Sequence, residues 1–431
     1  MIENYDLKID EVNMENVVFH GINKDDFLFI DWIILDGCNY RCSYCFGQSS
    51  LDKSQFVPVE KLKHAVDQIF KINRKTYIFN ILGGEPTFYP YLMDLVSYID
   101  SFKKNIILSF ITNGSRSIEY FNDLISSFKC ESIFNISLHM EYVDIKHIEE
   151  LIKLFNKHKK RVFFSLMTHP EYKEKTYYVF EEMLNLRKKY VFDLYLFELK
   201  APPDFQTIDK RYDDEFIKWI DFNRGHYDFL SNKYIQYDTN LDIRYPLSNN
   251  SFYRIEYNDT HKDISITHSL ALRNMKRNFK NFYCCSGINL LSIDSMGYYR
   301  GGVCPVIPYI GNIYNEDIDI YKLSRYYKCT MEQCGCNTND CNYKYRYKID
   351  ADKYVNDYII ANSNLIISQL NNKLEFNNLQ ISDLNKKMFE FQNEFYAIKK
   401  NVDRIINLIA WWIPVKKWRE SFRDKFKSDH E

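Results

Sequence analysis

The chain has 431 residues, of which 45% are hydrophobic and 17% aromatic, so it can bury a sizeable core and is not a disordered protein. Its length predicts two or three domains. The formal net charge of -1 provides no overall positive field that would attract nucleic acid. The 11 cysteines are the informative part of the composition, because three lie within 38–45, seven lie within 284–341 and Cys130 stands alone.

The redox state of the cellular compartment determines whether clustered cysteines form disulfides or bind metals. The first residues carry no basic end followed by an apolar run, so the sequence predicts no signal peptide. No stretch reaches the roughly 18 apolar residues that a membrane-spanning helix needs. We therefore expect a cytoplasmic protein, in which thiols stay reduced. Clustered cysteines in that setting are expected to bind a metal or an iron–sulfur cluster rather than to form disulfides.

Short apolar runs alternate with segments of helical spacing between residue 28 and about residue 198. The runs that predict strands are 28–35, 77–82, 106–111, 133–138, 162–166 and 191–197. Helical spacing fills the intervals at 59–72, 91–102, 118–128, 145–158 and 173–189. Strand–helix units in series predict a parallel sheet covered by helices, and near-continuous apolar strands fit burial on both faces. Periodicity alone does not decide between an open sheet and a barrel.

The next segments give weaker signals. Residues 200–283 are polar and irregular, and they predict no definite elements. The cysteine block 284–341 is rich in loops, as expected where ligation supplements a small core.

Beyond residue 351 the sequence predicts a long helix with one apolar seam. Its members recur at alternating intervals of three and four residues, which is the heptad spacing of a coiled coil. They are Ile367, Leu370, Leu374, Ile381, Leu384, Met388, Phe391, Phe395, Ile398, Val402, Ile405, Ile409 and Trp412, interrupted only by Asn377. We expect self-association through this seam, the alternative being a helix packed on its own protein. Pro414 ends or kinks the helix.

The end of the chain interleaves aromatic and basic residues. Trp411, Trp412 and Trp418 alternate with Lys and Arg up to Lys427. Such a pattern suits peripheral contact with the inner membrane face, where rings sit at headgroup level and cations meet anionic lipid. A solvated helix end or a partner-binding face is the alternative. Over a short stretch this end resembles the C-termini of some bacterial surface-polysaccharide biosynthesis proteins.

The first cysteine group is a Cys-x3-Cys-x2-Cys motif formed by Cys38, Cys42 and Cys45, directly after the first predicted strand. Three thiolates so close in sequence can bind one metal centre, whereas zinc usually takes a fourth ligand. Three ligands leave one coordination position open, which favours a reactive iron–sulfur cluster over a structural site.

This motif, with Tyr44 before its last cysteine, resembles the signature of the radical S-adenosylmethionine (radical SAM) enzymes. Further motifs follow at the ends of the next three strands, namely Gly83-Gly84-Glu85-Pro86, Thr112-Asn113-Gly114 and Ser137-Leu138-His139. The resemblance covers residues 28 to about 198. It implies an α/β fold with a partial (β/α)6 barrel whose site lies at the carboxyl ends of the strands.

The resemblance also implies cofactors. Cys38, Cys42 and Cys45 would hold a [4Fe–4S] cluster whose open iron binds SAM through its amino and carboxylate groups. One electron from a donor such as flavodoxin or ferredoxin would split SAM into methionine and a 5′-deoxyadenosyl radical, which would take a hydrogen atom from the substrate. The residues that the resemblance assigns to SAM are Tyr44, Gly83, Gly84, Glu85, Asn113 and Ser137.

Each assignment has a structural alternative. Gly83 and Gly84 would let the backbone approach the methionine moiety, or they simply form a turn. Glu85 would orient the SAM ammonium, or it is a helix N-terminal charge. Asn113 and Ser137 would reach the ribose or carboxylate, or they are cap or turn residues.

Other residues near these motifs remain open. His139 and Glu141 replace the Asp-Gly that is more usual in relatives, and they either face the site or are structural. Cys130 is expected to be an inert thiol. The residues do not identify a catalytic acid or base.

The second cysteine block resembles the SPASM or shortened twitch extension of radical SAM enzymes. The resemblance rests on an Ile293-Asp294-x-x-Gly297 hairpin signal between Cys285 and Cys304, followed by Gly311-Asn312-Ile313. Such extensions carry one or two auxiliary [4Fe–4S] clusters. Here a one-residue gap before Cys336 replaces the usual two, and no cysteine follows Cys341. We therefore expect one auxiliary cluster.

The ligands expected for that cluster are Cys285, Cys304, Cys334 and Cys336, with Cys329 or Cys341 as alternatives. Cys284 is expected to be a bystander. The competing interpretation is a structural zinc site.

These features divide the chain into an N-terminal extension (1–27), a radical SAM core (28–230), a connecting segment (231–283), a SPASM/twitch-like domain (284–350), a coiled-coil helix (351–413) and a basic aromatic tail (414–431). The tail favours an enzyme acting on a surface-polysaccharide or nucleotide-sugar intermediate, whereas the cysteine block favours a peptide or protein maturase. A non-catalytic iron–sulfur electron-transfer or scaffold protein is the third alternative, against which the intact motifs argue. No basic groove or stacking motif predicts nucleic acid binding.

Overall fold

The computed structural model describes residues 9–22, 26–45, 47, 50–51, 56–202, 205–223, 226–228, 233–235, 250–257, 260–335 and 338–427. Residues Met1–Ser363 form one compact unit, and Asn364–Glu431 form a second. Each helix in these ranges is too short or too polar to cross a membrane.

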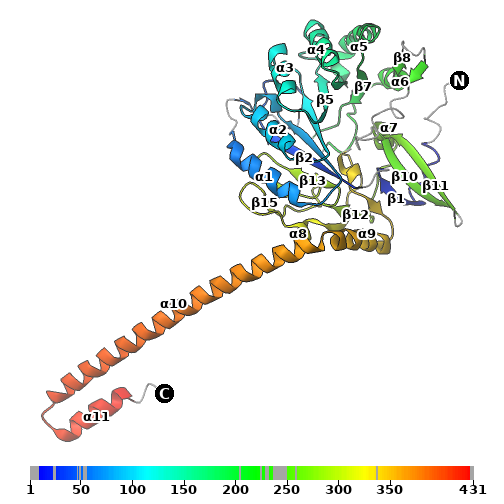
Figure 1. The fold of residues 1–431 in the computed structure, drawn as a ribbon. Helices are drawn as coiled ribbons and strands as arrows, with labels where there is room; N and C mark the ends of the chain where they lie inside the picture. Colours follow the sequence, from blue (N-terminus) through cyan, green and yellow to red (C-terminus); the bar gives the residue numbers. More distant parts are fainter. Residues whose placement is uncertain are drawn as a thin grey trace. The chain divides into compact units, whose positions relative to one another are not determined.

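Six parallel strands form the centre of the first unit and lie side by side in chain order. They are β2 (Phe27–Leu35), β3 (Thr76–Gly83), β4 (Ile106–Thr112), β5 (Glu131–Leu138), β6 (Arg161–Thr168) and β7 (Asp193–Glu198). The helices between them are α1 (Val59–Lys71), α2 (Leu92–Ser101), α3 (Ile118–Ser126), α4 (Ile145–Lys157) and α5 (Lys173–Arg187), which lie along one side of the sheet (Figure 1). This order confirms the predicted α/β core with a partial (β/α)6 barrel.

The alternation of sequence patterns explains these elements. In α4, Ile148, Leu151, Ile152 and Phe155 fall on one helical face and are buried, while the Asp144 side chain accepts a hydrogen bond from the Lys146 amide at the helix start. The strands are buried along most of their length, because helices cover one face and the barrel interior lies on the other.

The remainder of the first unit completes a second sheet of six strands in the order β11-β10-β1-β17-β12-β16. These strands are β1 (Val17–Gly21), β10 (Asn250–Tyr257), β11 (Thr260–Thr267), β12 (Tyr283–Ser286), β16 (Arg325–Lys328) and β17 (Lys344–Tyr345). The N-terminal extension, the connecting segment and the cysteine block therefore share one sheet rather than forming separate bodies. No local pattern predicts this arrangement, because its strands pair across long distances in the sequence.

The cysteine block also extends the barrel sheet. Strand β13 (Leu290–Ile293) pairs in parallel with β2, and β14 (Tyr298–Arg300) and β15 (Gly311–Asn312) continue the sheet outward. The remaining short elements of the first unit are α6 (Asp214–Asn223), β8 (His226–Asp228), β9 (Lys233–Ile235), α7 (His268–Arg273) and α8 (Ile320–Leu323), with 3-10 turns at Pro86–Phe88, Pro170–Tyr172 and Thr338–Cys341.

The long C-terminal helix begins later than the sequence suggested. Helix α9 (Lys348–Ala361) belongs to the first unit and contacts β12, β16 and β17, and Asn362 separates it from α10 (Ser363–Trp411). Helix α11 (Lys416–Lys427) follows the break at Pro414 and carries the basic aromatic sequence. Contact of α11 with a membrane remains a prediction.

Candidate functional site

The Cys-x3-Cys-x2-Cys motif forms a loop directly beyond the carboxyl end of β2. Cys42 is buried, and Cys38 and Cys45 are partly exposed. The Cys45 amide donates to the Cys42 carbonyl at 3.0 Å, and the Tyr40 amide donates to Cys38 Sγ at 3.3 Å. Burial raises the pKa of the Cys42 thiol to about 12, so a thiolate at this position needs a cation such as iron beside it.

Residues at the end of β5 support this loop. His139 Nδ1 lies 3.3 Å from Cys42 Sγ and 2.5 Å from the Tyr44 hydroxyl, and burial lowers the pKa of His139 to about 4, which keeps the ring neutral. The Glu141 carboxylate accepts the Ser43 amide at 3.0 Å. His139 and Glu141 therefore position the cysteine loop, and Tyr44 contributes its hydroxyl to the same network.

Gly83 and Gly84 are required by the approach of two chain segments. A Cβ at Gly83 would lie 2.1 Å from the Leu35 carbonyl oxygen, and one at Gly84 would lie 2.3 Å from the carbonyl oxygens of Asp36 and Gly37. The Gly84 amide donates to Leu35 at 2.7 Å. The space left by the missing side chains is thus occupied by the start of the cysteine loop, a role that the sequence did not indicate.

Glu85 is fully buried and links the ends of β3 and β4. Its Oε1 accepts from the amide and hydroxyl of Thr87 and from the Thr112 hydroxyl at 2.7 Å, and its Oε2 accepts from the Asn113 amide at 2.7 Å. Burial raises its pKa, and these hydrogen bonds oppose that shift. Glu85 therefore caps a short 3-10 turn and holds the Asn113 backbone through its own hydrogen bonds.

A pocket adjoins the cysteine loop at the ends of β4 and β5. It brings together Asn113 and Ser137, two of the six residues that the resemblance assigns to SAM. Tyr40 and Tyr142, which the sequence did not identify, stack with ring centroids 4.1 Å apart and also line it. The remaining lining residues are Gly114, Ser115, Leu138, His139, Val143, Asp144, His147 and Ile148. A polar pocket with a stacked tyrosine pair can take a ligand with hydrogen-bonding groups and a flat ring.

The barrel interior changes from apolar to polar along the strands. One buried layer takes an apolar residue from each of the six strands, namely Phe29, Ile78, Ile107, Ile133, Phe163 and Tyr195. Two residues further along five of the strands lie Asp31, Asn80, Ser109, Asn135 and Ser165, which share the same side because strand side chains alternate. Hydrogen bonds link the members of this polar layer. The Asn80 amide group donates to Asp31 at 2.8 Å, the Ser109 hydroxyl donates to the Asn80 side-chain oxygen at 2.9 Å, and the Ser165 hydroxyl donates to the Asn135 side-chain oxygen at 2.8 Å.

Asp31 is the ionisable member of this polar layer. Burial raises its pKa from 3.8 to about 6, with the hydrogen bond from Asn80 opposing the shift. Between these two pH values the folded chain binds more protons at this site than the unfolded chain, so the carboxylate lowers stability as the pH rises through that window. A destabilising buried acid inside a barrel is typical of a functional position.

We expect Asp31→Asn to stabilise the protein above about pH 6 by roughly 2–3 kcal/mol, because the amide keeps an acceptor for Asn80 and removes the buried charge. Urea unfolding of the wild type and the variant at about pH 5 and pH 8 measures this effect, and the gain should shrink at the lower pH. A gain of equal size at both pH values would contradict the assignment to ionisation.

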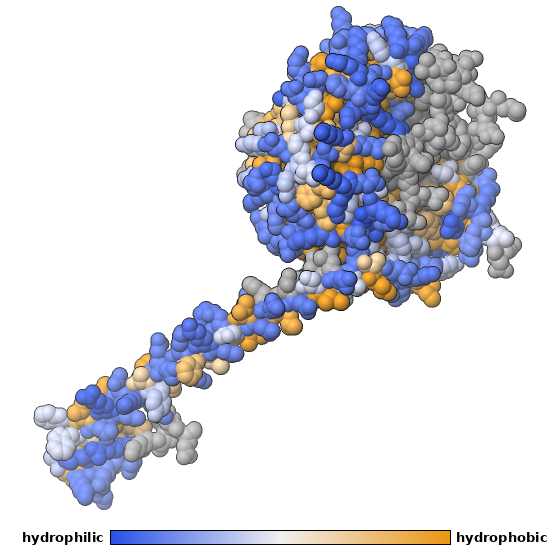
Figure 2. All heavy atoms as spheres, viewed as in Figure 1, coloured by the Kyte–Doolittle hydropathy of each residue, from blue (hydrophilic) through white to orange (hydrophobic). Residues whose placement is uncertain are grey.

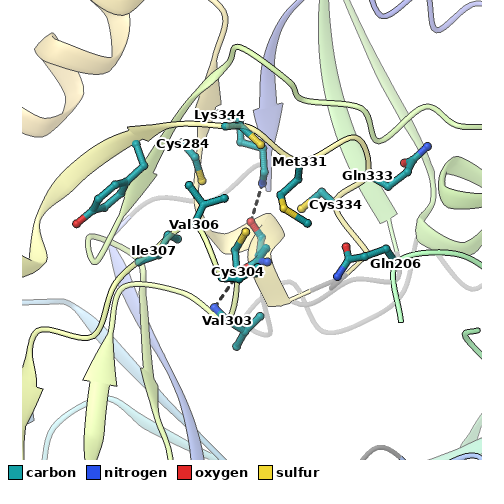
Figure 3. Close-up of a pocket in the computed structure, with 14 residues that line it drawn as sticks. Gln206, Cys284, Val303, Cys304, Val306, Ile307, Met331, Gln333, Cys334 and Lys344 are labelled. Atoms are coloured by element: carbon teal, nitrogen blue, oxygen red, sulfur yellow. Dashed lines mark hydrogen bonds between the residues drawn. The ribbon is translucent and has the colours of Figure 1, made fainter. Parts of the chain in front are cut away.

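The second cysteine block forms a pocket of its own. Cys284, Cys304, Cys329 and Cys334 line it, and Figure 3 shows the thiols of Cys284, Cys304 and Cys334 together with Lys344 on its wall. Burial raises the pKa of Cys284 to about 12 and also raises those of Cys304 and Cys329. Four thiols from three chain segments line this pocket, which is the number of cysteine ligands that a [4Fe–4S] cluster takes.

Cys284, expected to be a bystander, lines this pocket, whereas Cys285, expected to be a ligand, does not. They are neighbours on β12, and side chains on a strand alternate between its two faces. Cys284 lines the pocket, whereas Cys285 is buried outside it and is only 1% exposed. The spacing could not distinguish these adjacent residues, because the choice depends on which face of β12 meets the pocket.

One other expected ligand, Cys341, lies away from the pocket. Cys341 is fully buried and packs among Phe27, Phe29 and other barrel residues, so it does not line the pocket. Cys336 lies outside the described residues. Cys130, which was expected to be an inert thiol, is half-buried, and its backbone amide donates to the Asp100 side chain near the end of α2.

Buried charges lie beneath this pocket. Arg277 is fully buried, donates to both oxygens of Asp340 at 2.5 and 3.0 Å, and donates from Nε to the Cys334 carbonyl at 2.6 Å. Lys344 is 2% exposed and donates to the carbonyls of Asn339 and Asn342. Burial lowers the pKa of His20 and His268 beside Asp340, so both rings are neutral.

These charges complement a metal cluster. Arg277 and Lys344 are positive and Asp340 is negative, so the buried group carries one net positive charge next to the thiols. A [4Fe–4S] cluster with four thiolates is an anion, which this charge would stabilise. In the described ranges no group of three or more His, Cys, Asp or Glu side chains is arranged to hold a metal ion without rearrangement, and a structural zinc site stays the competing interpretation.

Comparison with known proteins finds sequence similarity over the first part of the barrel. A family profile described as "Radical SAM superfamily" matches residues 32–141. A GTP 3′,8-cyclase of Nostoc sp. (strain PCC 7120) is 36% identical over 97 residues, which are 22% of this chain and 29% of that protein. An S-adenosylmethionine-dependent nucleotide dehydratase of Psychrobacter lutiphocae is 31% identical over 121 residues, which are 25% of this chain and 40% of that protein.

Solved structures give weaker similarity over a longer range. The structure of anSMEcpe with bound AdoMet is 18% identical, with a TM-score of 0.46, and the match covers 69% of this chain and 80% of that one. SuiB of Streptococcus suis is 17% identical, with a TM-score of 0.43, and the match covers 68% and 64%. The matches to the cyclase and the dehydratase span less than half of those proteins.

Proposed function

Because the chain belongs to the radical SAM superfamily through residues 32–141, we propose that it cleaves SAM reductively and uses the resulting radical to remove a hydrogen atom from a substrate. The observation that carries the proposal is the cysteine loop at the end of β2, held next to the polar pocket of Asn113 and Ser137. Both lie at the carboxyl ends of parallel strands, where such sheets place their sites.

Each group has a part in this reaction. Cys38, Cys42 and Cys45 would hold a [4Fe–4S] cluster, which when bound would pass one electron from a donor such as flavodoxin or ferredoxin to SAM and break its bond between sulfur and C5′. The products expected from SAM are methionine and 5′-deoxyadenosine, and the latter would carry the hydrogen atom taken from the substrate. Asn113 and Ser137 supply polar contacts for SAM, and His139 and Glu141 hold the cysteine loop in position.

We infer that the substrate is polar, because Asp31, Asn80, Ser109, Asn135 and Ser165 form a polar layer inside the barrel. A nucleotide-linked sugar, such as an intermediate of surface-polysaccharide synthesis, has the hydroxyl groups that such a layer can bind. Two of the similar proteins are named for nucleotide chemistry, which supports this class. The four-thiol pocket favours the alternative substrate, a peptide or protein.

We also propose one auxiliary [4Fe–4S] cluster bound by Cys284, Cys304, Cys329 and Cys334. The convergence of their side chains on one pocket and the positive charge beneath it support this ligand set.

Formation of 5′-deoxyadenosine tests the reaction. Anaerobically reconstituted, dithionite-reduced protein should convert SAM to 5′-deoxyadenosine, measured by liquid chromatography with mass detection. Cys42→Ala should reduce the product to background because it removes a cluster ligand. Cys130→Ala is the matched control, since Cys130 lies away from both cysteine sites, and it should retain the activity. Product from Cys42→Ala at the wild-type rate would refute the proposal.

Substrate class is tested in the same assay. A nucleotide sugar that is a substrate should accelerate 5′-deoxyadenosine formation and lose a hydrogen from its sugar ring. If nucleotide sugars have no effect and a cysteine- or serine-containing peptide accelerates the reaction, the peptide alternative replaces the first.

A further inference from the structure

The apolar seam of α10 is exposed along its whole described length. From Ile367 to Ile409 its apolar members are between 47% and 67% exposed, and Trp412 is 84% exposed. Figure 2 shows hydrophobic side chains recurring along this helix between hydrophilic ones. Twelve large apolar residues on one helix predict a partner that covers them.

The heptad spacing indicates that the partner is another helix. The seam keeps an average interval of 3.5 residues over the 42 residues, or six heptads, from Ile367 to Ile409. In a straight α-helix such a seam drifts by about 20° per heptad, so over six heptads it turns by about 120°. A flat protein surface cannot cover a stripe that turns this far, whereas a helix that supercoils around α10 can follow it.

We propose that the partner is α10 of a second copy of this chain, in a parallel, in-register, two-stranded coiled coil. Asn377 is the one polar residue of the seam, and it lies 10 residues after Ile367 and 35 before Trp412. Parallel helices in register place the two Asn377 side chains opposite each other, where their amides can pair. A slip by one heptad or an antiparallel arrangement over the full seam would bury each amide against an apolar side chain without a partner.

The residues that flank the seam agree with this arrangement. With Ile367 as position a of the heptad, Glu394 falls on position g and Lys399 on position e of the following heptad. These two positions face each other across a parallel coiled coil, so each Glu394 meets the Lys399 of the other copy with opposite charge. Within one helix they are five residues apart and are not neighbours.

The composition of the seam favours two strands. Four of its seven a positions are β-branched, namely Ile367, Ile381, Val402 and Ile409, and Leu occupies two of the seven d positions, at Leu370 and Leu384. β-branched a with Leu at d is typical of parallel dimers, and Ile398 and Ile405 at d depart from it, so the measured mass decides the number of strands. Because α11 follows α10 directly, the dimer would bring two copies of the basic aromatic α11 to one end of the coil.

Light scattering on the full chain tests the association with a matched pair of variants. We expect a mass twice the chain mass of 52.0 kDa. The double variant Leu384→Lys and Phe391→Lys changes two d positions and should be monomeric. The double variant Leu379→Lys and Phe389→Lys changes a Leu and a Phe of similar exposure on other faces of α10, and it should stay dimeric. A monomeric wild type, a trimer, or equal behaviour of the two variants would overturn the proposal.

Charge exchange tests the orientation. Glu394→Lys alone and Lys399→Glu alone should each raise the dimer dissociation constant several-fold, because like charges then face each other. The double exchange should restore the wild-type dissociation constant, as measured by sedimentation. If the double exchange binds no better than the single variants, the helices are not parallel and in register.

Discussion

Replacing Cys284 by alanine is expected to remove the auxiliary cluster, whereas the same change at Cys285 leaves it in place. The two residues are adjacent on β12, but only Cys284 lines the four-thiol pocket. Loss of one of four ligands exposes an iron and weakens the site, while loss of the Cys285 thiol removes a buried group on the other face of the strand. The pair therefore separates ligation from packing at almost the same position.

The measurement needs protein in which the first cluster cannot form. We expect the Cys38→Ala, Cys42→Ala and Cys45→Ala triple variant to retain iron, acid-labile sulfide and an electron paramagnetic resonance signal after reduction. Adding Cys284→Ala should abolish that signal, and adding Cys285→Ala should not. Retention with Cys284→Ala and loss with Cys285→Ala would restore the ligand set expected from the sequence. A triple variant without iron would refute the auxiliary cluster altogether.

Local sequence signals predict the barrel core, but they do not predict which of Cys284 and Cys285 lines the second cysteine pocket. The barrel core could be predicted because its signals are local: each apolar run predicts a strand, and each motif follows a strand end. Asn113 and Ser137 meet in one pocket for that reason, since neighbouring parallel strands bring their carboxyl ends together. Cys284 and Cys285 are also close to a strand signal, but the face that each occupies depends on β16 and β17, which pair with β12 from distant positions.

The buried charges could not be predicted for the same reason. His20, His268, Arg277, Asp340 and Lys344 come from strands, helices and turns far apart in the sequence, and none belongs to a recognisable motif. They meet because β1, β12 and β17 share one sheet. Charged residues are rarely fully buried without partners, so from sequence alone each would be placed on the surface.

Truncating Asp340 should destabilise the fold strongly. The Asp340 carboxylate accepts two hydrogen bonds from Arg277, which is fully buried, so Asp340→Ala leaves a guanidinium without its counter-charge. Breaking a buried pair in this way costs about 3–5 kcal/mol, a large part of the roughly 5–15 kcal/mol that keeps a domain folded. His20 and His268 cannot compensate, because both are neutral or, when protonated, positive.

The chain contains a matched control for this experiment. Arg254 and Asp263 form the same bidentate pair at 2.9 and 3.1 Å, but both side chains are 46% exposed. Water solvates Arg254 when its partner is removed, so Asp263→Ala should lower the free energy of unfolding by only about 0–1 kcal/mol. Denaturant unfolding followed by near-ultraviolet circular dichroism compares the two variants, and equal losses would show that burial of the Arg277–Asp340 pair is not the cause.

The same variant links the charges to the second cysteine pocket. The Arg277 side chain also donates to the Cys334 carbonyl, and the Arg277 carbonyl accepts a hydrogen bond from the Cys334 amide at 2.9 Å. Arg277 therefore fixes the backbone that carries one thiol. Asp340→Ala should therefore lower auxiliary iron together with stability, whereas Asp263→Ala should leave auxiliary iron unchanged. If Asp340→Ala loses stability but keeps its full auxiliary iron content, the buried pair supports the sheet alone and has no part in holding the Cys334 ligand.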